Sequence, residues 1–117
     1  MQLVQWNMDR GPTHEDLSMA ALEAFARSIR SVLSGSKLPE ARQRQLVEDI
    51  VWTLASVFED GKMTLADKRY GLRLGFVTEL GEPVRVEGIF SLRDYVQGMV
   101  EQAYNDDPEH GFPTRMA

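Results

Sequence analysis

Hydrophobic residues recur with a helical period through the first half of the chain. When successive residues are placed about 100° apart, seven apolar side chains fall within one broad arc: Leu17, Ala21, Leu22, Phe25, Ile29, Val32 and Leu33. Thr13 and Asp16 have the spacing of a capping box, in which each side chain accepts a hydrogen bond from the other residue's backbone N–H. The segment therefore predicts a helix over residues 13–33. Its charged residues lie on the other side of that helix: Glu23, Arg27 and Arg30.

A second helical period follows a break at residues 34–37, where serine and glycine interrupt the pattern. Pro39 suits the first position of a helix, because that position needs no backbone N–H. Gly61 suits the position just past a helix end, where a left-handed conformation is common. We expect a helix over residues 39–59, antiparallel to the first because the link is short. Its apolar arc comprises Leu46, Val47, Ile50, Val51, Leu54, Val57 and Phe58.

The period changes to two beyond residue 70, which is typical of strands with one face in water. Between two alternating runs, the Gly-Glu-Pro sequence at residues 81–83 predicts a turn rather than a ligand-binding loop. A three-residue loop there pairs Leu80 with Val84, sets Phe76 opposite Gly88 and keeps the apolar faces together. The apolar face of this predicted hairpin over residues 70–90 comprises Tyr70, Leu72, Leu74, Phe76, Leu80, Val84, Val86 and Phe90.

An isolated hairpin is only marginally stable in water, so another strand should join this one. Residues 62–66 are the nearest candidate and would turn at residues 67–69 into a three-stranded meander. The N-terminal segment, residues 1–12, offers residues 2–6 as an edge strand. An edge shared with a second copy of the chain is the third candidate.

A third helix is expected before the C-terminus. Ser91 and Asp94 repeat the capping-box spacing, and the helix should end near Asn105. Gly98 within it indicates the close approach of another backbone, because glycine weakens a helix by about 1 kcal/mol relative to alanine. Residues 106–117 contain two prolines and predict an irregular tail. The apolar residues of the predicted helix are Leu92, Val96, Met99, Val100, Ala103 and Tyr104.

These elements predict a single α+β domain over residues 1–117, in two layers. It combines an antiparallel helix pair, a small antiparallel sheet (a hairpin or a three-stranded meander) and a C-terminal helix. A length of 117 residues with 43% hydrophobic and 26% charged residues fits one ordinary globular domain.

Charge and composition exclude several classes of function. The net charge of −5 is spread along the chain and should repel phosphate backbones, so nucleic acid is an unexpected partner. The chain has no cysteine, which excludes disulfides and thiol catalysis. It has no leader-like N-terminus and no apolar run near the ~20 residues of a membrane span. We therefore expect a cytoplasmic protein that does not bind membranes.

Trp52 is the main anomaly of the second predicted helix, because it lies almost opposite the apolar arc. Glu48 lies beside it, and Glu59 and Asp60 end the helix, where the dipole disfavours negative charge. One interpretation is that the N-terminal segment, for example Trp6, covers Trp52. The other is an exposed aromatic anchor ringed by acids, as at the centre of many protein interfaces.

The second interpretation gives the main functional hypothesis, a small acidic interaction protein of bacterial or phage type, such as an inhibitor, an immunity-like factor or an adaptor. It would bind a protein partner with a basic surface through Trp52, Glu48, Glu59 and Asp60, and the short sheet also favours a homodimer. The alternative is a small-ligand-binding domain or small enzyme with its pocket between sheet and helices, near Tyr70, Tyr95 and Tyr104.

No residue pattern supports catalysis or a cofactor. The chain has no nucleophile elbow and no glycine-rich phosphate loop, so binding is favoured over enzymatic activity. Lys68, Arg69 and Arg73 form a basic cluster that a charged turn explains. We expect no metal site, because the residues that resemble one lack the spacing that would hold an ion: His14, Asp106, Asp107, Glu109 and His110.

Overall fold

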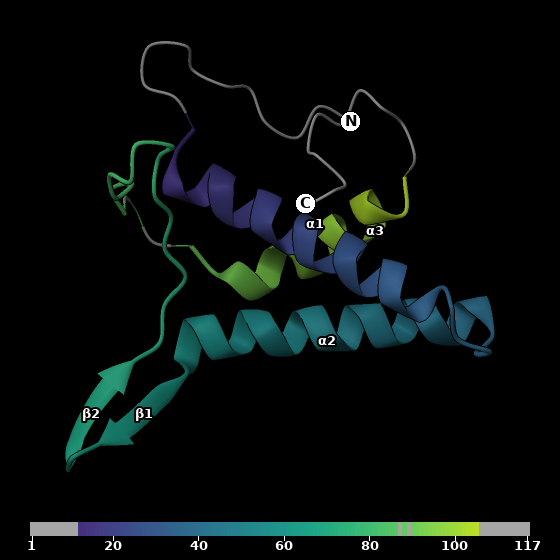
Figure 1. Cartoon of the computed structure of the whole chain (residues 1–117), viewed down its shortest axis with the longest axis horizontal. Coiled ribbons are helices and arrows are strands. Elements are labelled where there is room, and N and C mark those ends of the chain that lie inside the picture. Colours follow the sequence, from purple (N-terminus) through teal and green to yellow (C-terminus); the bar gives the residue numbers. More distant parts are fainter. Residues whose placement is uncertain (1–11, 87, 89, 106–117) are drawn as a thin grey trace.

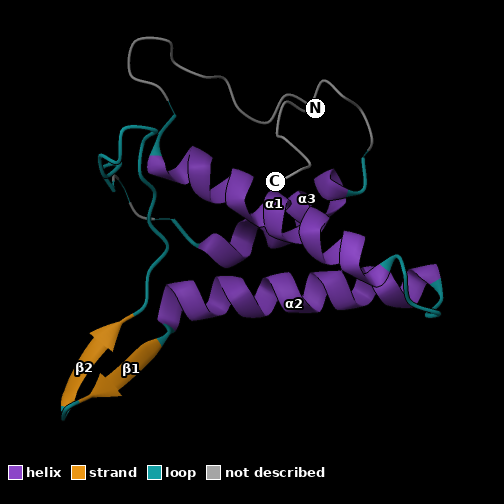
Figure 2. Cartoon of the chain, viewed as in Figure 1, coloured by secondary structure: helices purple, strands orange, loops and turns teal. Residues whose placement is uncertain are grey.

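The fold is α+β, with helices that surround one core and a hairpin that extends away from them (Figures 1 and 2). The computed structural model describes residues 12–86, 88 and 90–105. The predicted N-terminal strand and all of the C-terminal tail lie outside these residues. The described elements are α1 (His14–Leu33), α2 (Glu40–Asp60), β1 (Lys62–Leu65), β2 (Lys68–Gly71), the 3-10 helix η1 (Leu92–Tyr95) and α3 (Val96–Ala103).

Helix α1 begins with the predicted capping box. The Thr13 hydroxyl accepts a hydrogen bond from the Asp16 N–H at 3.1 Å, and the Asp16 carboxylate accepts one from the Thr13 N–H at 3.0 Å. These bonds satisfy backbone donors that the first helical turn leaves unpaired. The predicted start and end of α1 are therefore confirmed to within one residue.

Helix α2 runs antiparallel to α1, as the short link predicts (Figure 1). Both predictions for its ends were wrong in detail. Pro39 is the N-cap, in an extended conformation with ψ 147°, and not the first helical residue. Gly61 is also extended, with φ −63° and ψ 138°, because the chain passes directly from α2 into β1. A side chain at Gly61 would collide with the carbonyl oxygen of Val57, so glycine is needed for space and not for a left-handed turn.

The core lies where α1, α2, η1 and α3 meet. Five of the six apolar residues predicted for the C-terminal helix are buried in it, which confirms that periodicity, and Tyr104 packs at its edge. The residues of the core are Leu22, Ala26, Val47, Val51, Ala55, Leu92, Val96, Met99, Val100 and Ala103.

The start of the C-terminal helix differs from the prediction. Its first turn is the 3-10 helix η1, and Ser91 makes no side-chain cap bond, so the expected capping box with Asp94 is absent. The helix ends at Ala103, two residues earlier than expected. Gly98 is exposed, and an added Cβ there would meet no described atom within 4 Å. The expected close approach at Gly98 was therefore wrong.

The charged side of α1 is partly buried. Glu23 is only 1% exposed and binds Arg27 at 2.8 Å. Arg27 also donates to the carbonyl oxygens of Gln102 and Asn105, at 3.2 and 3.1 Å. The carbonyls at a helix end lack partners within the helix, and the α1 arginines supply donors to them. This contact brings α3 over the side of α1 that carries Glu23.

The regular strands lie earlier in the chain than expected. β1 and β2 pair antiparallel, with Met63 opposite Tyr70 and Leu65 opposite Lys68, around a turn at Ala66 and Asp67. Both turn residues have positive φ, 52° and 65°, as the tight turns of two-residue hairpins require. The candidate strand at residues 62–66 is thus confirmed over Lys62–Leu65, but its turn precedes the predicted one. All eight strand residues are exposed, so the expected sheet layer over the helices is not confirmed.

Residues 72–90 form no regular strand in their described part, which corrects the predicted hairpin. A single bridge joins Val77 to Pro83, and Val84 N–H donates to the Phe76 carbonyl oxygen at 2.9 Å. Phe76 therefore lies opposite Val84 and not opposite Gly88. Leu80 lies in the turn and is 86% exposed, so it does not pair with Val84.

The alternation of residues 72–90 still predicts burial correctly for most of its inner face. Leu74 and Phe90 pack against the core, and Leu72, Phe76 and Val84 are half-buried. The described odd-numbered neighbours between residues 73 and 85 are exposed. Tyr70, Leu80 and Val86 are exposed despite their even positions. The period of two thus correctly indicated which side of this segment is apolar. The segment does not, however, form the regular backbone hydrogen bonds of paired strands.

Candidate functional site

Trp52 lies outside the core, as its position on the predicted helix indicated. Its side chain is 51% exposed in the middle of α2. Glu48 is half-buried one turn earlier, and the exposed Asp49 accepts a hydrogen bond from Gln45 at 2.9 Å. We name Glu48, Asp49 and Trp52 the Trp52 face. Trp6, the alternative cover for Trp52, lies outside the described residues.

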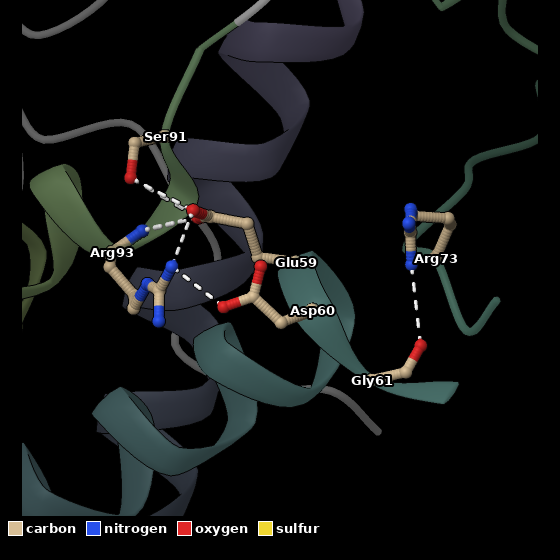
Figure 3. A network of polar contacts seen from close by, with 6 residues as sticks. All are labelled: Glu59, Asp60, Gly61, Arg73, Ser91 and Arg93. Carbon is tan, nitrogen blue, oxygen red and sulfur yellow. Dashed lines mark hydrogen bonds and ion pairs between the residues drawn. The ribbon is translucent and has the colours of Figure 1, made fainter. Parts of the chain in front are cut away.

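Glu59 and Asp60 are held by Arg93 from η1 (Figure 3). The Glu59 carboxylate accepts hydrogen bonds from the Arg93 N–H at 3.1 Å and from the Arg93 guanidinium at 3.0 Å. The Ser91 hydroxyl donates to both of its oxygens, at 3.1 and 3.2 Å. Asp60 accepts from the same guanidinium at 2.7 Å. We name Glu59, Asp60, Ser91 and Arg93 the Glu59 cluster.

The Glu59 cluster explains why two acids end a helix. Arg93 supplies the positive charge that the end of α2 lacks, and it comes from residues more than thirty positions away in the chain. Partial burial alone would raise the pKa of Glu59, but the hydrogen bonds from Arg93 and Ser91 outweigh it and hold this pKa below its ordinary value of 4.5. The hydrogen bond to Glu59 raises the pKa of the Arg93 guanidinium.

The hairpin arm, residues 62–71, extends away from the helices (Figure 2). Its apolar and basic side chains are exposed. Met63, Leu65 and Tyr70 share one face and are between 46% and 70% exposed. Lys68 lies opposite Leu65 on that face, and Arg69 belongs to the other. Sequence reasoning missed this surface, although the alternation of Lys62, Met63, Thr64 and Leu65 was the signal that could have revealed it.

The three tyrosines of the alternative hypothesis lie apart. Tyr70 is on the hairpin arm, and the Tyr104 ring lies beneath the Arg30 and Arg44 guanidinium groups, whose carbons are 4.4 and 4.9 Å from its centroid. The Tyr95 hydroxyl donates to the Glu15 carboxylate. This hydrogen bond, with burial and the charge of Glu15, raises the pKa of Tyr95 to about 12. None of the three lines the cavity described next.

A cavity of about 380 Å³ opens between the start of α1, the end of α2 and the segment that leads to η1. His14 forms part of its wall and is buried. The Nε2 atom of His14 lies 3.0 Å from the Leu74 carbonyl oxygen, and Nδ1 has no partner among the described residues. Other residues of the wall include Phe58, Glu59, Arg73, Leu74, Phe90 and Leu92.

The other candidate residues have ordinary surroundings. In the described part of the chain, no three histidine, aspartate or glutamate residues are placed to hold a metal ion. His14 is buried at the start of α1, while the remaining residues considered as ligands, 106–110, lie outside the description. Within the same part of the chain, no helix is long and apolar enough to cross a bilayer. Lys68 and Arg69 are exposed on β2, and Arg73 turns back to the Gly61 carbonyl oxygen.

No family model, curated protein or solved structure matches this chain.

Proposed function

We propose that the protein is a small protein-interaction module whose contact surface is centred on Trp52, of the kind that inhibitors, immunity proteins and adaptors represent. The observation that carries this proposal is the half-exposed indole in the middle of α2, beside Glu48 and Asp49. Large aromatic side chains are enriched at interface centres and account for much of the binding energy there. The acidic neighbours favour a partner with basic side chains.

The Glu59 cluster limits which acids can bind that partner. Glu59 already accepts hydrogen bonds from Ser91 and Arg93, so its charge is largely satisfied within the chain. The Asp60 side chain is 62% exposed and can accept a second basic donor. In this proposal Glu48, Asp49 and Asp60 attract the partner, and Glu59 holds Arg93 in place behind them.

The partner that best fits this surface is a second copy of the chain. The hairpin arm offers the complementary chemistry on one face, with Met63, Leu65 and Tyr70 for the indole and Lys68 for the acids. A two-stranded hairpin is marginal in water, so cover for its apolar face would stabilise it.

The dimensions also agree with a symmetric dimer. From Trp52 to Asp60 α2 is ~12 Å long, at about 1.5 Å per residue. Each four-residue strand extends ~13 Å beyond the helix end. A two-fold axis near Gly61 would therefore lay each arm along the Trp52 face of the other copy, in an isologous interface.

Charge reversal tests this arrangement. We expect sedimentation equilibrium to show a dimer that both E48K/D49K and K68E convert to monomer, because each variant sets like charges against each other. Combining all three substitutions in one chain, or mixing the two variant proteins, should restore the dimer. A wild-type chain that stays monomeric at millimolar concentration, or a dimer that survives both reversals, would overturn the proposal.

A further inference from the structure

We propose that Arg73 is a positioning residue that holds the hairpin arm in the direction required for association. This inference rests on the proposed dimer, in which each arm must reach the Trp52 face of the other copy. All eight strand residues of the arm are exposed, so packing against the helices does not fix its direction. The direction therefore depends on the root of the arm, where Gly61 joins α2 to β1 and Leu72 follows β2.

Gly61 joins α2 to the arm in one tight conformation. Its N–H donates to the Val57 carbonyl oxygen at 2.8 Å, and an added Cβ would lie only 2.2 Å from that oxygen. The Gly61 carbonyl oxygen accepts a hydrogen bond from the Leu72 N–H at 3.0 Å, which links the two ends of the arm. The sheet beyond has only two strands, so small changes of a few backbone angles at this root would swing the whole arm.

Arg73 adds a side-chain contact across the root (Figure 3). Its Nη1 atom donates to the carbonyl oxygens of Gly61 and Leu72, at 3.4 and 2.9 Å, so one guanidinium binds both ends of the arm. The same group lies against Gly71, where an added Cβ would come within 3.1 Å of Nη1 and 3.3 Å of Cζ. Glycine at position 71 thus leaves the space that the guanidinium occupies.

The Arg73 guanidinium lies on the face of the arm opposite the proposed contacts. Met63 pairs with Tyr70 on the contact face. Gly71 pairs with Lys62 one position further along, and successive positions of a strand point to opposite faces. Arg73 therefore holds the arm from behind, and its replacement leaves the contact face unchanged.

NMR relaxation of the backbone amides tests this contact in a monomer, for which the K68E chain serves as the background. R73M keeps much of the length of the side chain and removes its donors. We expect the order parameters of the arm to fall from ~0.85, the value of a rigid backbone, to below ~0.6 while those of the helices stay unchanged. R73K should restore part of the loss, because its ammonium group can donate to the same oxygens. R69M removes a cation from the same face and should change nothing. An arm that stays rigid in R73M would overturn the inference.

G71V displaces the guanidinium without removing its charge. The valine side chain would fill the space beside Nη1, and a β-branched residue suits a strand, so the strand itself is not weakened. We expect G71V to loosen the arm as R73M does, and R73M/G71V to be no looser than either variant alone. Additive effects would contradict the contact between the two residues.

Sedimentation equilibrium tests the consequence for association, without the K68E background. Each dimer uses two arms, so an arm that points correctly for about a third of the time weakens the dimer about tenfold, because the two fractions multiply. R73M should show this loss and R69M should not. A loosened arm with unchanged dimer affinity would overturn the role of Arg73 in association. A monomeric wild type would overturn the proposed dimer, and the relaxation data would then show separately whether Arg73 holds the arm.

Discussion

The carboxylate of Glu59 accepts hydrogen bonds from both the backbone N–H and the guanidinium of Arg93, at 3.1 and 3.0 Å. The two residues join the end of α2 to the start of η1, and the Ser91 hydroxyl completes the contact. Because η1 leads directly into α3, this contact also determines where the C-terminal helix meets the core. The Glu59 carboxylate, which is unfavourable at a helix end, thus forms a tertiary contact between α2 and η1.

Replacing Glu59 distinguishes this link from a simple helix-end charge. If only the dipole mattered, E59A would stabilise the protein by about 0.3–1 kcal/mol. The lost hydrogen bonds act in the opposite direction and should dominate, with a net destabilisation of about 1–3 kcal/mol. Chemical denaturation followed by circular dichroism measures the change. The matched control E79A, at an exposed loop position, should change stability by no more than about 0.5 kcal/mol. A stabilised E59A would show that the cluster contributes little.

The lowered pKa of Glu59 predicts that the unfolding free energy depends on pH. The pKa of Glu59 lies below its ordinary value of 4.5 in the folded chain, so the unfolded chain binds its proton more readily. The stability it contributes is complete above pH 4.5 and is lost as the pH falls through the lower folded value. The difference in unfolding free energy between wild type and E59A should therefore shrink on acidification. A difference that is constant from neutral to strongly acidic pH would contradict this assignment.

Tyr95 predicts an effect at alkaline pH. Its pKa is raised to about 12, chiefly by the hydrogen bond to Glu15, so the fold favours the neutral phenol. This contribution is complete below the ordinary value of 10.0 and is lost as the pH rises through about 12. The double variant Y70F/Y104F leaves Tyr95 as the only tyrosine for an ultraviolet titration. In that background E15Q should lower the midpoint, and an unmoved midpoint would show that Glu15 does not cause the shift.

The buried pair of Glu23 and Arg27 should be strongly coupled. R27M leaves the Glu23 carboxylate buried without its cation and should cost about 3–5 kcal/mol of unfolding free energy. E23Q/R27M removes the buried charge as well and should recover part of that loss. Denaturation of the single and double variants gives the coupling energy by a double-mutant cycle. If the effects of E23Q and R27M simply add, the two side chains do not act as a pair.

Trp52 should matter more for association than for folding. Because half of its side chain is exposed, W52A should cost no more than about 1–2 kcal/mol of stability while weakening the proposed dimer. L22A, at a fully buried position of the core, should cost about 2–5 kcal/mol. Thermal unfolding and sedimentation measure the two effects separately. A loss for W52A as large as that for L22A would place the indole in the core and remove it from the proposed surface.

Sequence patterns that depend only on residues close together in the chain predicted much of this fold. The capping box of Thr13 and Asp16 located the start of α1, because its bonds join residues only three positions apart. The helical period identified the buried residues of α3 and the outward position of Trp52. The alternation of residues 72–90 indicated the apolar side of the chain for Leu74 and Phe90. Backbone geometry alone sets these periods, so they can be read before any packing is known.

Contacts between distant residues required the tertiary structure. Ser91 has the spacing of a cap, yet its hydroxyl donates to Glu59, because the packing of η1 against α2 brings a charged acceptor within reach. Glu23 lies outside the apolar arc of α1, yet it is buried and paired with Arg27, which donates to a carbonyl oxygen of α3. The sequence by itself determined where the helices lie and which sides are apolar. Only the packing of those helices decided which polar groups meet, because the energy of a hydrogen bond or ion pair depends on a distance that spacing along the chain does not specify.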